Sequence, residues 1–235
     1  MTICPPLFKT ICLICAVFLS GCVSPEVPPT ETRMATSFVQ AYYPIEKITA
    51  QVRDQWNILL WSQAGDPLPT QKAQALNLLH QDVCEEYTYS VPSDDNIFTI
   101  AQDFTAVSVS CDRDFDEGHP AGSDLGDVIA FYSVSCYPFI RSGQKDTYDW
   151  TTQKEDFSDW FLSRKDPRWS PVYKKVSELS SDDMVLLGPS LRHSCLLAKL
   201  RLLKRPSGKG AFSFRIGLTD TQGKSYEANR ISMDF

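Results

Sequence analysis

The stretch LLAKLRLLKRPSGKGAFSFRIGLTDTQGKSYEANRISMDF, residues 196–235, alternates apolar and polar side chains and is interrupted by turn-forming residues. A period of two is typical of a strand with one buried face. Residues 196–202 and 212–218 both show this period, and the Pro-Ser-Gly-Lys-Gly segment at 206–210 predicts the turn between them. The end of the chain therefore predicts consecutive antiparallel strands joined by tight turns.

A third strand is expected after the next turn, at residues 226–235. Its apolar positions are even-numbered as far as Ala228 and odd-numbered from Ile231 onward. One additional residue in a strand shifts the register by one position and moves the apolar side chains back to the same face. We therefore expect a β-bulge near Asn229 and Arg230.

Four upstream segments are also short, β-branched or aromatic, and bounded by turn-forming residues, as strands are. These segments are residues 45–53, 87–91, 97–102 and 106–111. Many short strands together with a terminal meander favour a mainly β fold, and we expect an antiparallel, Ig-like β-sandwich.

Two segments favour helices instead. Residues 70–81 place Ala73, Leu76 and Leu79 at near-helical spacing, which predicts a short helix. Thr152-Gln-Lys-Glu155 matches a capping box and is followed by aromatic side chains at helical spacing, which predicts a helix at 152–164. We expect this second helix to lie in an insertion at about 148–173 that packs on the sandwich.

The first residues have the pattern of an export signal. Lys9 precedes an apolar run at residues 11–19 that ends in Ser20 and Gly21. A membrane-spanning helix needs roughly 20 apolar residues, and this run is much shorter. We therefore expect residues 1–21 to be removed after export.

The junction Leu19-Ser20-Gly21-Cys22 resembles the lipobox of bacterial lipoproteins. The resemblance implies that Cys22 becomes the acylated first residue of the mature protein, so the membrane is an expected partner through two or more lipid chains. Val23 after the cysteine favours the outer membrane by the same resemblance. The alternative is an ordinary secretory signal, after which Cys22 joins a disulfide.

Residues 22–41 are rich in Pro, Ser, Thr and Glu, and we expect a flexible tether there. The remainder, residues 42–235, has the length of one domain. In overall plan the chain resembles the envelope lipoproteins that gut-type Bacteroidota encode in large numbers. This resemblance implies a location and no activity.

The formal net charge of −6 makes nucleic acid a poor partner, because its phosphates repel an acidic protein. Beyond the expected signal and Cys22, four cysteines remain: Cys84, Cys111, Cys136 and Cys195. In an oxidising compartment they can form disulfides in three pairings, and the alternative is that they are buried free thiols.

The segment from Asp112 to Gly118 alternates aspartates, with carboxylates at Asp112, Asp114 and Asp116. Ca²⁺ takes six to eight oxygen ligands, and a curled loop of this kind supplies several. The match to an EF-hand loop is partial, because Glu117 stands where the glycine is needed. The alternatives are therefore a calcium site and a solvated acidic loop.

Three tryptophans, Trp150, Trp160 and Trp169, together with Tyr148 and Tyr173, suggest a platform for sugar rings. Packing of these aromatic side chains onto the sheet is the competing interpretation, and we favour it.

No catalytic motif of a hydrolase is present, and no P-loop or dinucleotide fingerprint occurs. Ser190, His193 and Ser194 are close in sequence without further support for a triad. We therefore expect a lipid-anchored binding or structural module of the cell envelope, with a glycan or a protein as ligand. The alternative is an envelope glycan hydrolase that uses paired carboxylates such as Asp156 and Asp159.

Overall fold

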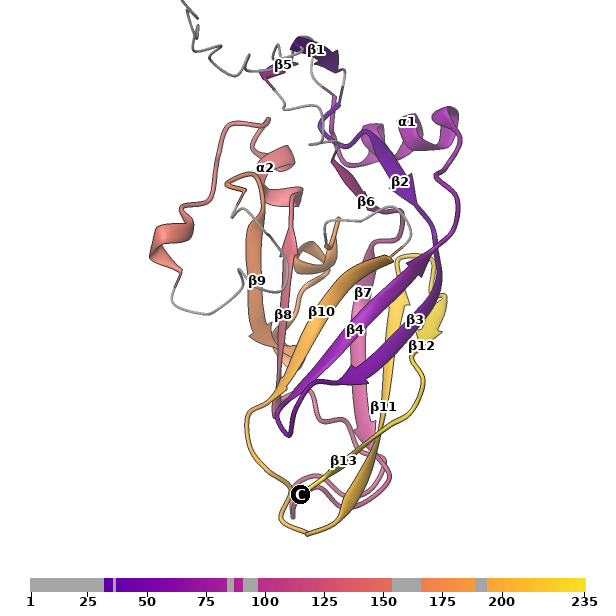
Figure 1. Ribbon diagram of the computed structural model, residues 1–235, viewed down its shortest axis with the longest axis vertical. Coiled ribbons are helices and arrows are strands. Elements are labelled where there is room, and N and C mark those ends of the chain that lie inside the picture. Colours follow the sequence, from indigo (N-terminus) through magenta and orange to yellow (C-terminus); the bar gives the residue numbers. More distant parts are fainter. Residues whose placement is uncertain (1–31, 36, 84–86, 91–96, 154–165, 189–193) are drawn as a thin grey trace, which may run out of the picture. The chain divides into compact units, whose positions relative to one another are not determined.

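The computed structural model describes residues 32–235 except 36, 84–86, 91–96, 154–165 and 189–193 (Figure 1). Strands predominate among these residues and pair almost everywhere in antiparallel fashion. The prediction of a mainly β fold, a sandwich with a small helical insertion, is confirmed.

The larger sheet contains five strands in the spatial order β3-β4-β10-β8-β9, all antiparallel. Their bounds are Ile45–Val52 for β3, Asn57–Ala64 for β4, Ser194–Leu202 for β10, Ile129–Ser135 for β8 and Ser170–Lys175 for β9. The strands predicted at 45–53 and 196–202 are β3 and the main part of β10. Strands β4, β8 and β9 were not expected from the sequence pattern.

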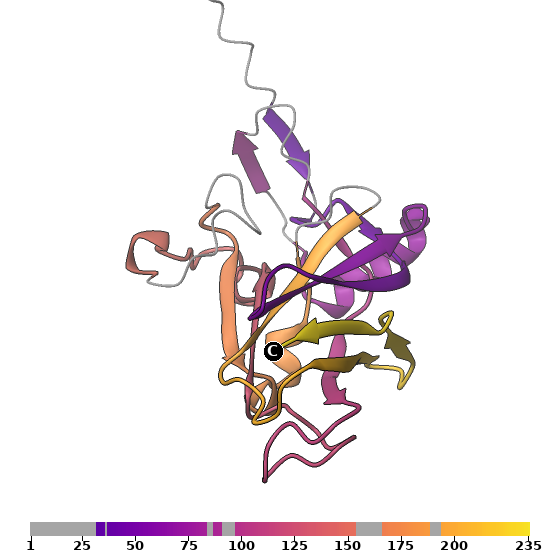
Figure 2. The same ribbon diagram turned by 60° about the horizontal axis from the view of Figure 1, so that its bottom comes forward.

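The smaller sheet is built on β11 (Ala211–Asp220). One edge of β11 pairs with β7 (Phe104–Cys111), and the other pairs with β12 (Ser225–Glu227) and β13 (Ile231–Asp234). Figure 2 shows the yellow strands of this sheet opposite the indigo and purple strands β3 and β4. The predicted C-terminal meander is therefore split between the two sheets, because β10 pairs with β4 and β8 and not with β11.

The sandwich core lies between the two sheets. It takes alternate side chains from each sheet, as the period of two requires. The larger sheet contributes Ile48, Ile58, Leu60, Ile129, Phe131, Ala198, Leu200 and Leu202, and the smaller sheet contributes Val109, Phe212, Phe214, Ile216, Leu218, Ile231 and Met233.

The larger sheet also buries part of its outer face, in a second core. Every residue of β8 is buried: Ile129 and Phe131 face the sandwich, whereas Tyr132 and Val134 belong to the second core. This second core is covered by α2 (Tyr137–Arg141), by the 3-10 helix η1 (Trp150–Thr152) and by the segment from Phe38 to Tyr42. A strand buried on both faces has no alternating pattern, which explains why β8 was not predicted from the sequence.

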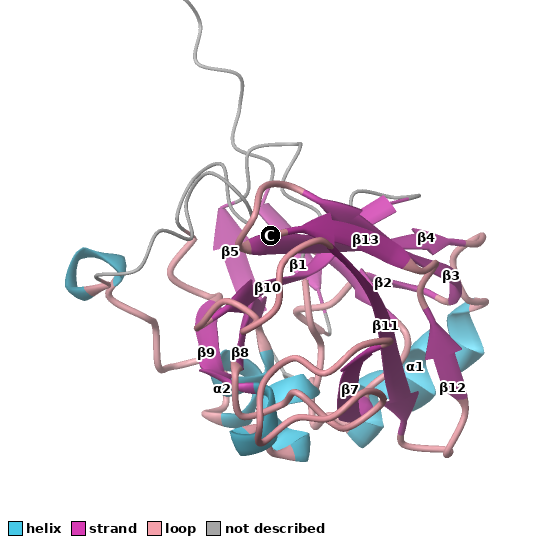
Figure 3. Ribbon diagram, turned by 90° about the horizontal axis from the view of Figure 1, so that it is seen from below, coloured by secondary structure: helices cyan, strands magenta, loops and turns pink. Residues whose placement is uncertain are grey.

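The remaining elements are short. Their bounds are Thr32–Ala35 for β1, Ala41–Tyr43 for β2, Thr70–Leu79 for α1, Tyr87–Ser90 for β5, Phe98–Ile100 for β6, Val176–Glu178 for η2 and Ser181–Met184 for η3 (Figure 3). The strands predicted at 87–91, 97–102 and 106–111 correspond to β5, β6 and β7. The pairing of β2 with β6 is parallel, which departs from an entirely antiparallel fold.

The helix predicted at 70–81 is α1, and its three apolar side chains at near-helical spacing do not all face inward. Ala73 and Leu76 pack against the second core, whereas the side chain of Leu79 is 68% exposed. The buried position one helical repeat after Ala73 and Leu76 is taken by His80, which caps the helix. The tether also ends earlier than residue 41, since Phe38 and Val39 are buried. The helix predicted at 152–164 lies almost entirely outside the described residues.

Two β-bulges set which side chains reach each core. Strand β10 has a bulge between Leu196 and Ala198 in its pairing with β4. Leu196 therefore belongs to the second core. Its alternation with Ala198 and Leu200 had predicted that all three share one face, but Ala198 and Leu200 belong to the sandwich core. The bulge predicted near Asn229 is confirmed: the register with β11 shifts by one residue between Gly217↔Glu227 and Phe214↔Ile231.

The bulge at residues 228–230 brings Asn229 to the edge of the other sheet. The side-chain amide of Asn229 accepts a hydrogen bond from the Ala50 N–H (2.8 Å) and donates one to the Ala50 carbonyl (3.1 Å). Ala50 belongs to β3, the edge strand of the larger sheet. Asn229 thus substitutes for a neighbouring strand and joins the two sheets at this edge.

We expect Asn229→Ala to lower the free energy of unfolding by about 1–2 kcal/mol, because two hydrogen bonds are lost at a partly exposed site. Urea denaturation followed by circular dichroism measures this change. Gln222→Ala is the matched control, since Gln222 is an exposed amide side chain in the nearby turn, and its stability is expected to equal that of the wild type. Equal stability of Asn229→Ala and Gln222→Ala would contradict the proposed closure of the edge.

Candidate functional site

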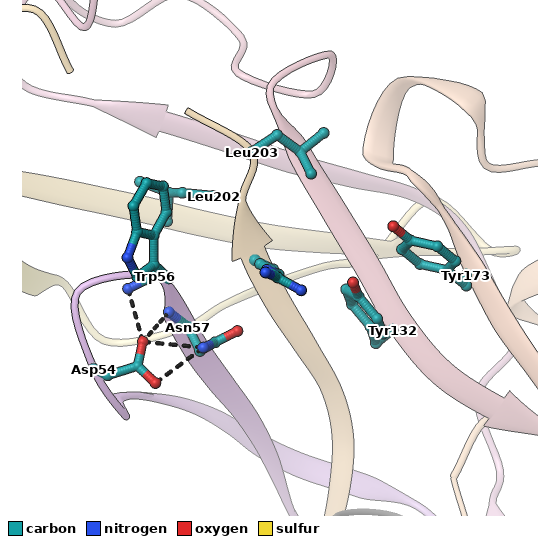
Figure 4. A pocket seen from close by; sticks show the side chains of 8 residues that line it. Asp54, Trp56, Asn57, Tyr132, Tyr173, Leu202 and Leu203 are labelled. Atoms are coloured by element: carbon teal, nitrogen blue, oxygen red, sulfur yellow. Dashed lines mark hydrogen bonds between the residues drawn. The ribbon is translucent and has the colours of Figure 1, made fainter. Parts of the chain in front are cut away.

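A groove with a volume of about 440 Å³ opens on the outer face of the larger sheet (Figure 4). This volume lies within the range of small-ligand pockets. The lining side chains come from the β3–β4 turn and from strands β4, β8, β9 and β10. They are Asp54, Trp56, Asn57, Tyr132, Tyr173, Arg201, Leu202 and Leu203.

One wall of the groove is fixed by the tight turn before β4. The Asp54 carboxylate accepts hydrogen bonds from the backbone N–H groups of Trp56 (2.7 Å) and Asn57 (2.9 Å) and from the Asn57 side-chain amide (3.0 and 2.9 Å). An aspartate that bonds to backbone groups two and three residues ahead is a common stabiliser of turns. The Trp56 carbonyl in turn accepts from Leu202 N–H (2.8 Å), which ties this wall to β10.

The Asp54 carboxyl is ionised in this turn. Partial burial acts to raise its pKa, but the hydrogen bonds from Asn57 and Trp56 and the nearby charge of Arg53 outweigh it, so the pKa of Asp54 is lowered. A carboxyl with a lowered pKa is a poor general acid. The residues that line the groove contain no second carboxylate to face it, so the pair that a glycosidase needs is not found there.

The opposite wall is aromatic. Tyr132 on β8 and Tyr173 on β9 are direct cross-strand partners, and their ring centroids are 4.4 Å apart. Tyr132 is 1% exposed, whereas Tyr173 is 43% exposed and presents its ring to solvent. The Lys199 ammonium lies 4.2 Å from the centre of the Tyr132 ring on its β10 side. The exposed aromatic surface of this wall is therefore Tyr173, held in place by a buried neighbour.

The tryptophans proposed as a platform lie elsewhere. Trp150 is 8% exposed and Trp169 is 2% exposed, and both belong to the second core. Trp150 also donates its indole N–H to the Asp166 carbonyl (2.9 Å). Trp160 lies outside the described residues. Of the aromatic group singled out in the sequence, Tyr173 lines the groove.

The aspartates proposed as calcium ligands have separate partners. Asp112 accepts from Ser213 N–H and Asp114 from Ala121 N–H, each at 2.8 Å. Asp116 pairs with Lys204 (2.6 Å) and with His119 (2.7 Å), and these contacts lower its pKa. Among the described residues, no group of three acidic, His or Cys side chains is placed to hold a metal.

His119 also contacts Asp127 (2.8 Å) through its other ring nitrogen. Its hydrogen bonds to Asp116 and Asp127 raise the pKa of this histidine, although burial opposes them. The loop therefore places two carboxylates around the His119 ring and one of them also against the Lys204 ammonium.

Cys111, Cys136 and Cys195 are buried free thiols, and Cys84 lies outside the described residues. Burial raises the pKa of the Cys136 thiol above its usual range and that of Cys195 to about 12. These three side chains therefore pack as small apolar groups, which is the alternative to the disulfides considered above.

The second core contains a polar network around His80. His80 contacts Asp103 through Nε2 (2.7 Å) and the Tyr42 hydroxyl through Nδ1 (3.3 Å), and Tyr42 donates to Asn77 (2.7 Å). Tyr42 and His80 are 0% and 5% exposed, so the network does not reach a substrate in solvent. Ser190 and His193 lie outside the described residues, as do Asp156 and Asp159.

Sequence reasoning missed most of the groove. The Asp54-x-Trp56-Asn57 turn between two strands was a local signal that an Asx-type turn holds an aromatic side chain at the surface. The pairing of β8 with β9 and β10 left no local signal, because it joins residues 41 and 67 positions apart along the chain, as in Tyr132↔Tyr173 and Tyr132↔Lys199.

Neither a scan against models of protein families nor searches of curated proteins and of solved structures find a match to this chain. No helix among the described residues has the length and apolarity required to span a membrane. The geometry of the groove is therefore the basis of the functional argument.

Asp82 offers a test of the second core, which shares Tyr132 with the groove. Its carboxylate accepts from the N–H groups of Phe38 (2.8 Å) and Val39 (2.7 Å) and from the Gln144 side chain (2.8 Å). Burial nevertheless outweighs these bonds and raises the pKa of Asp82. A carboxyl with a raised pKa in the folded state loses part of its stabilising contribution as pH rises from the unfolded value toward the folded one.

We expect Asp82→Asn to lower the free energy of unfolding by roughly 1–3 kcal/mol. The side-chain NH₂ group of the new asparagine would face a buried backbone N–H donor that the carboxylate accepts from in the wild type. The difference between variant and wild type is expected to shrink as pH rises from about 4, since only the wild type titrates there. Urea titrations at several pH values measure both effects. A gap that widens with pH would show the opposite sign for the pKa shift.

Proposed function

We propose that this protein is a lipid-anchored binding module of the cell envelope that holds a saccharide in the groove beside Tyr173. The observation that carries the proposal is the groove itself: an exposed aromatic ring, a half-buried Trp56 and several polar side chains line one hollow of about 440 Å³. Sugar rings combine an apolar face with hydroxyl edges, so a site for them needs both kinds of surface.

The groove suits a few sugar rings better than a protein surface. A standard protein–protein interface buries about 800 Å² on each partner, with an apolar centre. The groove instead offers a small hollow rimmed by Asp54, Asn57 and Arg201. Of the large exposed apolar side chains, Tyr173 and Leu203 line the groove, whereas Leu78, Leu79 and Val83 belong to α1 and the residues that follow it.

The preorganisation of the walls supports binding without large rearrangement. Asp54 fixes the turn that carries Trp56, and the buried ring of Tyr132 supports Tyr173 from the neighbouring strand. A ligand then meets side chains whose conformations are already restricted, which lowers the entropic cost of association.

The location belongs to the same proposal and rests on the lipobox resemblance at Leu19-Ser20-Gly21-Cys22. An acylated Cys22 followed by a proline-containing tether holds the domain at a membrane, with Val23 favouring the outer membrane. The lipid restricts the domain to a surface and so raises its local concentration near envelope glycans.

The groove is tested by affinity electrophoresis of the full-length chain in mild detergent through gels that contain dextran, xylan, mannan, alginate or polygalacturonate. We expect at least one polymer to retard the wild type, and Tyr173→Ala to weaken that binding about tenfold, which corresponds to about 1.4 kcal/mol. Leu78→Ser, on the exposed side of α1, is the control and is expected to bind as the wild type does. No retardation by any polymer, or unchanged binding of Tyr173→Ala, would contradict the proposal.

Acylation is tested separately with Cys22→Ser in a bacterial host that processes lipoproteins. We expect the wild type to fractionate with membranes and to lose residues 1–21, because two or more acyl chains give stable anchoring. The variant is expected to keep its signal or to leave the membrane fraction. Mass spectrometry that finds an unmodified Cys22 thiol in the wild type would exclude the anchor.

A further inference from the structure

We propose that the groove selects an acidic saccharide, one whose sugar residues carry carboxylates, over a neutral one. This inference rests on the proposed function and goes further by naming the class of ligand. It follows from the cationic side chains that the strand register places on the outer face of the larger sheet, in a protein whose formal net charge is −6.

The register aligns these cations in two neighbouring rows. In one row, Lys199 on β10 lies beside Tyr132, which lies beside Tyr173. In the next row, Arg201 and Lys175 flank Ala130 on opposite sides. Adjacent strands are about 4.8 Å apart, so the backbones that carry Arg201 and Lys175 are separated by about 10 Å, with only a methyl side chain between them.

A further cation lies at the Trp56 wall. The Arg205 guanidinium is 5.2 Å from the centre of the Trp56 ring and donates to the Gln55 side chain (3.2 Å). An arginine held against an aromatic ring keeps its charge at the surface, since the guanidinium is always protonated. Arg201 therefore lines the groove, and Lys175 and Arg205 lie beside its lining residues, whereas Lys199 is buried (8% exposed) against the Tyr132 ring.

The acidic groups near the groove are already engaged. The Asp54 carboxylate accepts hydrogen bonds from Trp56 and Asn57, and its lowered pKa keeps it ionised. Glu178 lies 3.8 Å from Lys175, and both side chains are about half exposed, so solvent weakens that pair. Arg201, Lys175 and Arg205 carry hydrogen-bond donors and a positive charge, so a ligand group that only accepts and is negatively charged, such as a carboxylate, matches them.

Electrostatic complementarity decides specificity more strongly than it decides affinity. A carboxylate on the sugar gains charge-assisted hydrogen bonds from Arg201 or Lys175, while the ring packs on Tyr173. A neutral sugar keeps the ring contact and loses the ionic one with Arg201, the cation that lines the groove. The site therefore distinguishes two sugars with the same ring by the charge that they carry.

The experiment compares oligogalacturonate with the same oligomer after complete methyl esterification, by isothermal titration calorimetry of the full-length chain in mild detergent. The two probes share their rings and differ in charge. We expect the acid to bind at least tenfold more tightly than the ester, and the difference to shrink when NaCl is raised from about 0.05 M to about 0.5 M, because salt screens exposed charges.

Variants at Arg201 separate charge from packing. Arg201→Gln is expected to lower the affinity for the acid about tenfold and to leave the affinity for the ester unchanged, whereas Arg201→Lys retains most of the preference. Leu78→Ser serves again as the control, and circular dichroism monitors folding of each variant. An Arg201→Gln variant that loses both ligands equally would indicate a packing role and would overturn the charge assignment.

The remaining outcomes are distinguishable. Equal or tighter binding of the ester overturns this inference and leaves the proposed function standing. Binding of a poly-glutamate peptide without binding of either oligosaccharide assigns the groove to an acidic polypeptide and overturns the saccharide class. Absence of binding to all three probes, together with no retardation in the polysaccharide gels, overturns both proposals.

Discussion

Burial of β8 on both faces is the constraint on which the structure depends. All of its side chains are buried, from Ile129 to Ser135, so the larger sheet requires one core against the smaller sheet and another on its outer face. The second core includes Ala130, Tyr132 and Val134 of β8, and α2 and η1 contribute to it. The groove lies beside this core on the same face of the sheet, and Tyr132 belongs to both (Figure 4).

The second core is held together by polar contacts as much as by apolar packing. Asp82 joins the segment at Phe38 and Val39 to Gln144, and Asp103 joins His80 to the backbone of Leu186. All positive-φ residues other than glycine in the described part of the chain lie at this network: Gln81 (φ 61°), Gln144 (φ 63°) and Leu186 (φ 49°). Such backbone conformations cost of order 1 kcal/mol each, so the buried hydrogen bonds determine the local chain path against its own preference.

Local sequence patterns predicted the strands and helices whose formation depends on residues close together in the chain. The alternation in 212–218 and the parity change around Asn229 gave β11 and the bulge before β13, because a half-buried strand shows its period in the sequence. Helix α1 was placed correctly, but the apolar spacing did not indicate that Leu79 is exposed and that the polar side chain of His80 is buried. The aromatic group was identified without its geometry: Trp150 and Trp169 entered a core, and Tyr173 entered the groove because β9 pairs with β8.

The groove illustrates why a site built on a sheet is hard to predict from one sequence. Its members are contributed by four strands and one turn, and their proximity depends on pairings of high sequence separation. The same pairings explain how an acidic chain presents basic side chains here: Arg201 and Lys175 are exposed on the outer face because their strands bury the alternate residues in the sandwich, whereas Lys199 is buried beside Tyr132. Charge segregation on this face is thus a consequence of register.

A shallow groove of this kind gives modest affinity for a single short ligand. With the proposed anchor, the avidity of many copies matters more than the affinity of one. Many copies tethered in one membrane face the same polymer, so each further contact along a repeating acidic glycan is intramolecular. Avidity then grows with the number of grooves engaged, whereas each contact remains weak and reversible. Such repeated binding needs no closed pocket, because each groove engages only a short part of the polymer.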